Sequence, residues 1–207
     1  PVRTMGAREY RPGDPYRAID WRASARRDTI MVRVFEPSTT PALDIVVNFL
    51  AAAHGWSRWE TDGLECALSV AASLAAYGAD HGWAVGLRGN GQSAGAPIEV
   101  PAAAAQGQLR TVLETLARAD TIATRPLAPL LAASTARTPA GATLLLITTT
   151  LDRSVVAALQ AQHRRGRPLL ALHVAPAYAP TPAASFPILR IDHDAHWVQR
   201  HALILAS

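Results

Sequence analysis

A short apolar run, Leu43–Ala52 (LDIVVNFLAA), is the stretch around which we expect the fold to form. The run is rich in Val and Ile and too short for a helix, a pattern typical of a strand buried on both faces. Pro41 precedes it, and the polar stretch His54–Ser57 follows it. Because later segments alternate between helical and strand patterns, we place this strand at the centre of a parallel sheet.

The segments after the central strand predict an open, mostly parallel, doubly wound α/β sheet with helices on both faces. Apolar positions at helical spacing predict helices over residues 61–81, 106–119, 127–136 and 154–164. Apolar or β-branched runs predict strands over residues 83–87, 97–100, 142–148, 169–174 and 186–191. The stretch Gly89–Gly95 is interpreted as a loop, which makes residues 97–100 an antiparallel edge strand.

Residues 1–40 precede the predicted sheet and form a separate arm. Pro12–Pro15 (PGDP) has turn chemistry, and Asp14 followed by Pro15 is a suitable N-cap and first residue for a short helix that extends to about Arg26. The β-branched segment Thr29–Glu36 (TIMVRVFE) predicts a strand. We therefore divide the chain into this arm, residues 1–40, and an α/β domain, residues 41–207.

The positive charge of the chain is concentrated in the arm. All twenty basic residues are Arg. The arm carries eight of them against five acidic residues, a net charge of +3, and the α/β domain carries twelve against eleven, a net charge of +1. This excess predicts an anionic or acidic-protein partner for the arm. A charge of +3 is too small to indicate nucleic-acid binding by itself.

The chain carries no signal for membrane insertion or secretion within its own length. No run of eighteen apolar residues is free of charge, and no secretory signal is visible near the start. Cys66 is the single cysteine, which excludes an internal disulfide and fits a reducing compartment. Because the chain begins at Pro1 rather than Met, we expect a fragment of a longer protein whose other part can hold membrane segments.

A family resemblance is carried by the segment Arg8–Glu36, REYRPGDPYRAIDWRASARRDTIMVRVFE. It resembles the signature of the bacterial "domain of unknown function 58" family, in which Arg-Glu-Tyr is followed by Pro-Gly-Asp, Arg-x-Ile-Asp-Trp, Ala-Arg and a strand ending in Phe-Glu. A match of about thirty residues is far more specific than a short motif. The matching positions before the strand are Arg8, Glu9, Tyr10, Pro12, Gly13, Asp14, Arg17, Ile19, Asp20, Trp21, Ala25 and Arg26.

The resemblance implies a function through protein partners. Members of the family are typically anchored in the membrane upstream of the signature, continue into a von Willebrand factor A-like domain, and are encoded beside AAA+ ATPases of the MoxR type. The chain is therefore expected to be the soluble part of a membrane-anchored protein at the cytoplasmic face of the cell membrane. Its expected role is that of a non-enzymatic protein-interaction module that acts with a MoxR-type AAA+ ATPase in protein assembly or remodelling.

The resemblance also points to the end of the central strand, where von Willebrand A-like domains hold a divalent cation through an Asp-x-Ser-x-Ser motif. The aligned positions are Asn48, Leu50 and Ala52, which together offer one amide oxygen. Asp152, near the end of a later strand, cannot replace the missing carboxylate and hydroxyls. We therefore predict a degenerate site with no metal and no cofactor. Asp44 is disfavoured as an alternative ligand because it lies at the entry of the strand.

Two further motifs favour ordinary structure over chemistry. Gly91–Gly95 (GQSAG) matches the Gly-x-Ser-x-Gly nucleophile elbow, but Pro97 and a strand-like run follow it in place of the required helix, so we interpret it as a hairpin loop. Asp192–His196 (DHDAH) collects four potential metal ligands. Adjacent ligands in a terminal loop rarely converge on one ion, so we interpret it as a solvated turn with at most adventitious metal binding.

The aromatic residues of the arm allow two interpretations. Tyr10, Tyr16 and Trp21 alternate with Arg in a way that suits base stacking. The signature contains acids as well as bases, which favours internal pairing instead. We therefore expect the arm to act first as a structural clasp, with Trp21 inserted between the arm and the sheet domain, and second as a docking surface.

A possible protein interface follows the central strand. Trp56, Arg58 and Trp59, together with Arg153, are residue types that dominate the binding energy of interfaces. The same tryptophans can instead fold inward over the vacant cation site, and both alternatives stay open at this point.

Three functions are therefore carried forward. The first is the non-enzymatic interaction module. The alternatives are a metal-dependent adhesion-type binding module with an atypical site, and Arg-mediated nucleic-acid binding. Titration with Mg²⁺ separates the first from the second, and a salt-dependent gel shift separates it from the third.

Overall fold

The computed structural model describes residues 4–11, 16, 19–35, 40–49, 58–133, 139, 141–176 and 180–192, with the backbone alone for residues 4–6, 33–35 and 58–61. The chain divides into two compact units, Pro1–Thr40 and Pro41–Ser207, which are the arm and the α/β domain. No helix in the described ranges is both long and apolar enough to cross a membrane.

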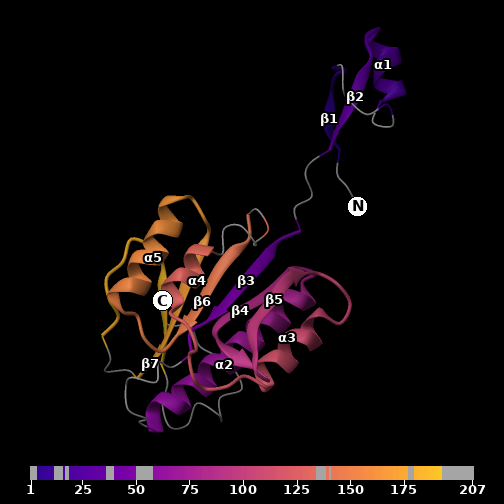
Figure 1. Cartoon of the computed structure of the whole chain (residues 1–207). Coiled ribbons are helices and arrows are strands. Elements are labelled where there is room, and N and C mark those ends of the chain that lie inside the picture. Colours follow the sequence, from indigo (N-terminus) through magenta and orange to yellow (C-terminus); the bar gives the residue numbers. More distant parts are fainter. Residues whose placement is uncertain are drawn as a thin grey trace. The chain divides into compact units, whose positions relative to one another are not determined.

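The α/β domain is built on a six-stranded sheet with the order β5-β4-β3-β6-β7-β8 (Figure 1). All neighbouring pairs are parallel except β4 and β5, which are antiparallel. The structure confirms the open, mostly parallel, doubly wound α/β sheet and the antiparallel edge strand. The strands are β3 (Ala42–Val47), β4 (Ala84–Ser93), β5 (Ala96–Ala103), β6 (Thr143–Thr148), β7 (Leu169–Ala175) and β8 (Ile188–Asp192).

β3 is the predicted central strand, and all six of its residues are buried. It ends at Val47, earlier than the apolar run suggests. The backbone N–H of Asn48 still donates to the carbonyl of Ile147 across the sheet (2.9 Å). The N–H of Phe49 instead donates to the side-chain oxygen of Asn90 (2.7 Å), so a side chain takes over the bonding of the backbone and the ladder stops there.

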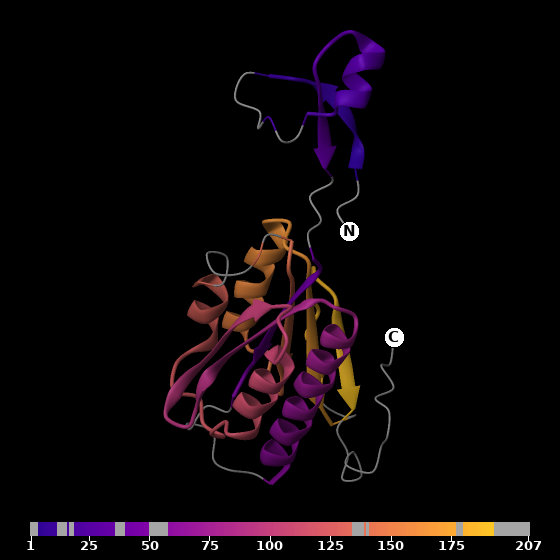
Figure 2. The same ribbon diagram turned by 90° about the vertical axis from the view of Figure 1, so that its right-hand side faces the viewer.

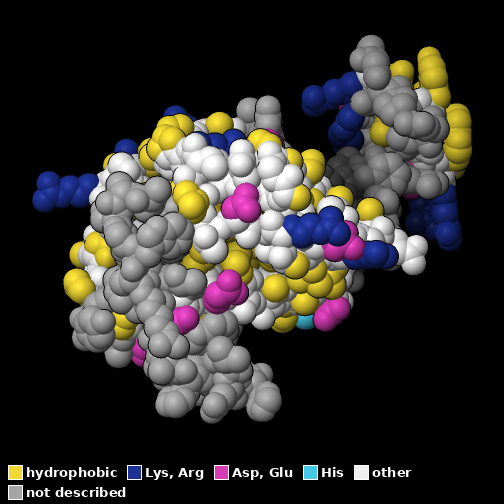
Figure 3. All heavy atoms as spheres, turned by 60° about the horizontal axis from the view of Figure 1, so that its bottom comes forward, with side chains coloured by type: hydrophobic (Ala, Val, Ile, Leu, Met, Phe, Trp, Pro, Cys, Tyr) yellow, Lys and Arg dark blue, Asp and Glu magenta, His cyan; other side chains and the backbone are white. Residues whose placement is uncertain are grey.

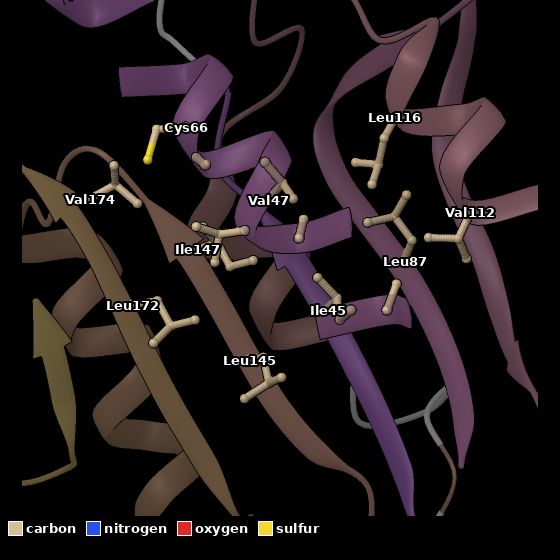
Figure 4. Packing of buried hydrophobic residues seen from close by; sticks show 14 of the residues in the cluster. Ile45, Val47, Cys66, Leu87, Val112, Leu116, Leu145, Ile147, Leu172 and Val174 are labelled. Atoms are coloured by element: carbon tan, nitrogen blue, oxygen red, sulfur yellow. The ribbon is translucent and has the colours of Figure 1, made fainter. Parts of the chain in front are cut away.

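Helices cover both faces of the sheet (Figure 2). α2 (Arg58–Asp80) and α3 (Gln108–Ala117) pack on one face, and α4 (Leu127–Ala133) and α5 (Arg153–Arg164) pack on the other. Ile45 and Val47 of β3 join the core beneath α2 and α3, shown in Figure 4, whereas Val46 joins the core beneath α4 and α5. Burial on both sides explains why the strand is apolar without alternation.

The predicted loop over Gly89–Gly95 is wrong for most of its length. β4 continues through Ser93, and only Ala94 and Gly95 form the turn into β5. The glycines serve close packing, because the ring of Phe49 lies against the strand. A Cβ atom at Gly89 would lie 2.7 Å from Cε2 of Phe49, and one at Gly91 would lie 2.9 Å from its Cγ. Glycine inside a strand often marks such a close approach.

The arm pairs two strands and adds one short helix. β1 (Thr4–Glu9), which the sequence analysis did not predict, is antiparallel to β2 (Met31–Phe35), which lies within the strand predicted for Thr29–Glu36. α1 (Trp21–Arg27) is the predicted helix with a different start.

Asp20 is the N-cap of α1, so the predicted start at Pro15 is wrong. One carboxylate oxygen of Asp20 accepts hydrogen bonds from the backbone N–H groups of Arg22 (3.1 Å) and Ala23 (3.0 Å). The preceding residue, Ile19, is held in an extended bridge to Val32 of β2, which a longer helix would break. Asp20 therefore takes the capping role that was predicted for Asp14.

Candidate functional site

The connections of β3 and β6 place a candidate site at their carboxyl ends. The chain passes from β3 to α2 on one face of the sheet and from the adjacent β6 to α5 on the opposite face. Ligands of open α/β sheets bind where neighbouring connections diverge in this way. The side chains at these strand ends therefore decide what the domain can bind or catalyse there.

A row of polar residues crosses the sheet at this edge. Asn48 and Thr148 follow in register from paired residues of β3 and β6, Thr148 pairs with His173 of β7, and His173 pairs with Arg190 of β8. We call this set the polar row: Asn90, Asn48, Thr148, His173 and Arg190. The sequence analysis found Asn48 but missed Asn90 and His173. The signal for His173 was a single polar side chain within an apolar strand pattern, whereas Asn90 stands between two glycines in a segment that resembles a loop.

Asn48 is held by its neighbours in the polar row. Its side-chain oxygen accepts a hydrogen bond from the amide of Asn90 (2.9 Å), and its own amide donates to the hydroxyl of Thr148 (2.9 Å). The Thr148 hydroxyl in turn donates to the backbone carbonyl of Thr150 (2.6 Å). Asn48 is 8% exposed, so these bonds satisfy a buried amide. The network is neutral and connected, and its donors and acceptors are directed at one another.

Of Leu50, Ala52 and Asp152, the other residues considered for the predicted degenerate metal site, only Asp152 lies in the described part of the chain. Leu50 and Ala52 lie outside the described residues. Asp152 is the N-cap of α5, where one of its oxygens accepts from the N–H groups of Ser154 (2.7 Å) and Val155 (2.9 Å). Burial raises the pKa of Asp152, but hydrogen bonds from the Ser154 hydroxyl and from these N–H groups outweigh it, so the pKa is lower than usual. Asp152 is thus engaged in capping.

Asp44 takes part in a buried charge cluster. Its carboxylate accepts from Nε (2.9 Å) and Nη2 of Arg88, and from Nη2 of Arg167 (2.6 Å). Asp44 is 3% exposed and Arg88 is 6% exposed. Nη1 of Arg88 also donates to the carbonyl of Leu130 in α4 (3.3 Å). The cluster joins β3, β4, α4 and the segment before β7, a structural role that the sequence analysis did not predict.

His173 is the titratable member of the polar row. It is 5% exposed, and its Nδ1 lies 3.3 Å from the hydroxyl of Thr181. Burial lowers the pKa of His173, and the positive charge of Arg190 lowers it further. A hydrogen bond to the backbone of Thr149 acts in the opposite direction, but burial is the larger effect. The folded protein therefore favours the neutral imidazole.

We expect the domain to lose stability as the pH falls below about 6.5, the usual pKa of a histidine in an unfolded chain. Because the pKa of His173 is lowered by folding, the unfolded chain binds the proton more readily. The contribution of His173 to the free energy of unfolding is then fully present above pH 6.5, and it is lost as the pH drops toward the folded-state pKa of His173. Urea unfolding on either side of pH 6.5 measures the slope.

The matched variants for this measurement are His173→Gln and His163→Gln. Gln at position 173 cannot take up the proton, so the slope near pH 6.5 should become shallower. His163 is exposed in the last turn of α5, and its replacement should leave the slope in place. A His173→Gln variant with the slope of the wild type would show that another group controls it.

The two motifs set aside in the sequence are ordinary structure in the described residues. Ser93 of the Gly91–Gly95 motif ends β4 and donates to the carbonyl of Thr115 (2.9 Å), and β5 follows where an elbow needs a helix. Asp192 ends β8 and pairs with Nε of Arg190 at 2.7 Å, and residues 193–196 lie outside the described residues. The described residues contain no group of three or more His, Cys, Asp or Glu placed to hold a metal.

The predicted interface residues are only partly described. Trp56 lies outside the described residues, and Arg58 and Trp59 are the first two residues of α2, with their side chains outside the description. Arg153 is the first residue of α5 and is exposed. The interface formed by these four residues stays a prediction.

The signature residues of the arm have distinct places. Arg8 and Glu9 end β1, Ile19 is buried against β2, Asp20 caps α1, and Ala25 and Arg26 lie exposed on α1; Pro12, Gly13, Asp14 and Arg17 are outside the described residues. Trp21 is 70% exposed. Trp21 is the first residue of α1, and its insertion between the arm and the sheet domain stays a prediction.

Comparison with known proteins shows which family and which relative the chain resembles. Residues 6–177 match the family described as "Protein of unknown function DUF58". A protein of Bacillus subtilis (strain 168), described as "Uncharacterized protein YeaD", is 37% identical over 67 residues. The aligned part is 32% of this chain and 15% of the relative, so the chain spans a small share of that protein's length.

Proposed function

The chain belongs to the DUF58 family of proteins of unknown function, and from this premise we propose that it is a non-enzymatic protein-interaction module. The observation that carries the proposal is the closed hydrogen-bond network of Asn48, Asn90 and Thr148 at the edge where ligands of this kind of sheet bind. Their polar groups bond to one another, so the strand ends present a neutral, rigid support for the loops above them. Such a support suits shape recognition better than the activation of a substrate.

The proposed partner is an AAA+ ATPase of the MoxR type, which the family resemblance supports. In this proposal the chain is the part of a membrane-anchored protein that lies at the cytoplasmic face, where it acts with the ATPase in assembling or remodelling other proteins. The six-stranded α/β sheet is compatible with a von Willebrand factor A-like domain, the type that the resemblance implies. The absence of a carboxylate at position 48 distinguishes this module from metal-dependent adhesion domains.

We expect the full-length protein to capture the MoxR-type ATPase encoded in the same genome. Purified proteins, mixed with and without ATP and passed over a size-exclusion column, should elute together in at least one nucleotide state. The double variant Arg58→Ala with Trp59→Ala tests the predicted contact at the start of α2. It should reduce capture while leaving the melting temperature unchanged if these side chains face the partner.

The matched control for this experiment is Arg164→Ala, which removes an exposed arginine from the last turn of α5. It should leave capture unchanged. Loss of both capture and stability in the double variant assigns the two residues to the fold instead of the interface. Separate elution in every nucleotide state would contradict the proposed partner.

A further inference from the structure

The arm buries little apolar surface and exposes much of it. Ile19, Met31 and Val32 are its buried hydrophobic residues in the described part of the chain. A two-stranded sheet with so small a core is marginally stable by itself. Three of the six large hydrophobic side chains exposed in the described residues nevertheless lie in the arm: Tyr16 (77%), Trp21 (70%) and Ile30 (49%). Exposed aromatic surface on a small unit indicates an interaction site.

These side chains gather at one end of the arm. The N–H of Tyr10 donates to the carbonyl of Ile30 (2.8 Å), and the rings of Tyr10 and Tyr16 stack with their centroids 6.2 Å apart. On the other side of β2, the N–H of Asp20 donates to the carbonyl of Met31 (2.8 Å), so Trp21 directly follows and Ile30 directly precedes the two residues that this bond joins. We call Tyr10, Tyr16, Trp21 and Ile30 the aromatic patch.

Positive charge borders the aromatic patch. α1 begins with Trp21, has no buried residue, and carries three exposed arginines, Arg22, Arg26 and Arg27. No acidic side chain occurs within α1. Asp20 precedes the helix as its N-cap, and Asp28 follows it. Figure 3 shows hydrophobic side chains gathered along one edge of the arm, with arginine side chains close by. Trp and Arg are the two residue types most enriched among interface residues of high binding energy.

We propose that the aromatic patch and the arginines of α1 dock an acidic protein surface with an apolar centre. This inference rests on the proposed function, since it names the binding surface of the interaction module and the chemistry of its partner. The arm has a net charge of +3 and the α/β domain one of +1, so neither a second copy nor the chain's own domain supplies a net negative counterpart. Electrostatic complementarity therefore favours a different, acidic protein.

A nucleic acid fits this surface less well. Exposed Glu9 and Asp28 lie at the end of β1 and directly after α1, so a continuous phosphate backbone would meet negative charge among the arginines. A protein surface can place its acidic groups opposite Arg22 and Arg26 and have none opposite Glu9 and Asp28. Trp21 would then fill an apolar depression between the acidic groups.

Two variants and two probes test the inference on the whole protein. The variants are Trp21→Ala and the double charge reversal Arg22→Glu with Arg26→Glu. The matched control is Arg164→Glu with Arg165→Glu, which makes the same charge change at exposed positions at the end of α5. The probes are the MoxR-type ATPase and a labelled synthetic peptide that alternates Glu with Leu and Phe. A peptide with Gln in place of Glu and a single-stranded oligonucleotide of equal length serve as comparisons. Fluorescence anisotropy at low and high salt measures binding of the peptide.

The expected result is selective loss of binding. Trp21→Ala should weaken binding of the acidic peptide about 30-fold, as expected for a central interface residue. The double charge reversal should weaken it by at least about tenfold at low salt and flatten its salt dependence. The control variant should bind like the wild type, and melting temperatures should be unchanged because the replaced side chains are exposed. A peptide with Gln in place of Glu should bind weakly to all of them.

The outcomes separate this inference from the proposed function. If the ATPase binds the wild type and both arm variants equally, the partner surface is elsewhere and the inference is overturned, while the proposed function stands. If the ATPase does not bind but the acidic peptide depends on Trp21 and the arginines, the inference stands and the proposed partner fails. A single-stranded oligonucleotide of equal length that binds more tightly than the peptide would replace the protein partner with a nucleic acid. If the protein binds none of the probes, both the inference and the proposed function are contradicted.

Discussion

Replacing Asp44 with Ala should lower the free energy of unfolding of the α/β domain by about 3–5 kcal/mol. Asp44 is buried in β3, and its carboxylate accepts hydrogen bonds from both Arg88 and Arg167. Without it, two nearly buried guanidinium groups would lose their shared counter-charge. The cost arises from desolvated positive charges that are left without that counter-charge. Urea or thermal unfolding at constant pH measures it.

A matched control is Glu114→Ala, which removes an ion pair of similar length at the surface. Oε1 of Glu114 lies 2.7 Å from Nε of Arg110, but both side chains are well exposed. Water screens such a pair, so its loss should change stability little. Equal effects of the two replacements would show that the Asp44 cluster does not hold the strands together.

Simultaneous replacement of the cluster tests the reason for the loss. Asp44→Leu with Arg88→Met and Arg167→Met removes both charge signs together and fills the space with apolar groups. Most of the stability lost in Asp44→Ala should return, because no buried charge is left unbalanced. A triple variant as unstable as Asp44→Ala would assign the effect to packing around the cluster rather than to charge.

The central part of the fold could be predicted because its signals are local. β3 shows as an uninterrupted apolar run, since both of its faces are covered. Helices α2 and α5 show as apolar positions at helical spacing next to buried strands. The length of β4 could not be predicted in the same way. Gly89 and Gly91 are typical of loops, and only contact with the distant Phe49 shows that they belong to a strand.

The candidate site was predicted at one position and missed at the others for a related reason. Asn48 could be found because it directly follows the most apolar strand. The partners of its amide, Asn90 and Thr148, are distant in sequence, and the register of three strands brings them together. No pattern along the chain contains that register. Asp44 was disfavoured as a ligand from its place in the strand, and the two arginines that bind it are distant in sequence as well.

The arm shows where a recognised signature fails to specify local geometry. The turn residues around Asp14 and Pro15 favoured an early helix start, yet Asp20 caps the helix because Ile19 is held against Val32. Tertiary pairing thus outweighed local propensity. Trp21 was predicted to insert between the arm and the sheet domain, and that stays a prediction. Within a unit with so small a core, its side chain is 70% exposed.

Asn48→Asp should lower the free energy of unfolding by about 3 kcal/mol near neutral pH. The hydroxyl of Thr148 donates to the carbonyl of Thr150 and accepts from the Asn48 amide. A carboxylate cannot supply that donor, and it adds a charge at a site that is 8% exposed. Asn48→Ala loses the donor to Thr148 and also the acceptor for Asn90, but it adds no buried charge and should lose less stability. Chemical unfolding of both variants measures the difference.

The pH dependence of the Asn48→Asp variant follows from the direction of the expected pKa shift. Burial should raise the pKa of the new carboxyl above the value of about 3.9 for an unfolded chain. The folded variant then binds a proton more readily than the unfolded chain, so its stability relative to Asn48→Ala should rise as the pH falls toward 4. The protonated carboxyl can also donate to Thr148 as the amide does. A difference that does not change with pH would rule out a buried charge as the cause.

Addition of Mg²⁺ separates a degenerate metal site from an unusual but competent one. In the wild type, millimolar Mg²⁺ or Mn²⁺ should leave the melting temperature unchanged, because only an ion that binds the folded state stabilises it. The amide of Asn48 offers one neutral oxygen, which already accepts from Asn90. In Asn48→Asp combined with Leu50→Ser, a carboxylate and a hydroxyl are hard ligands suited to Mg²⁺, and part of the lost stability should return on adding the ion. A saturable rise in the wild type itself would instead favour the metal-dependent adhesion alternative, since the ion would then have found its ligands without any change at position 48.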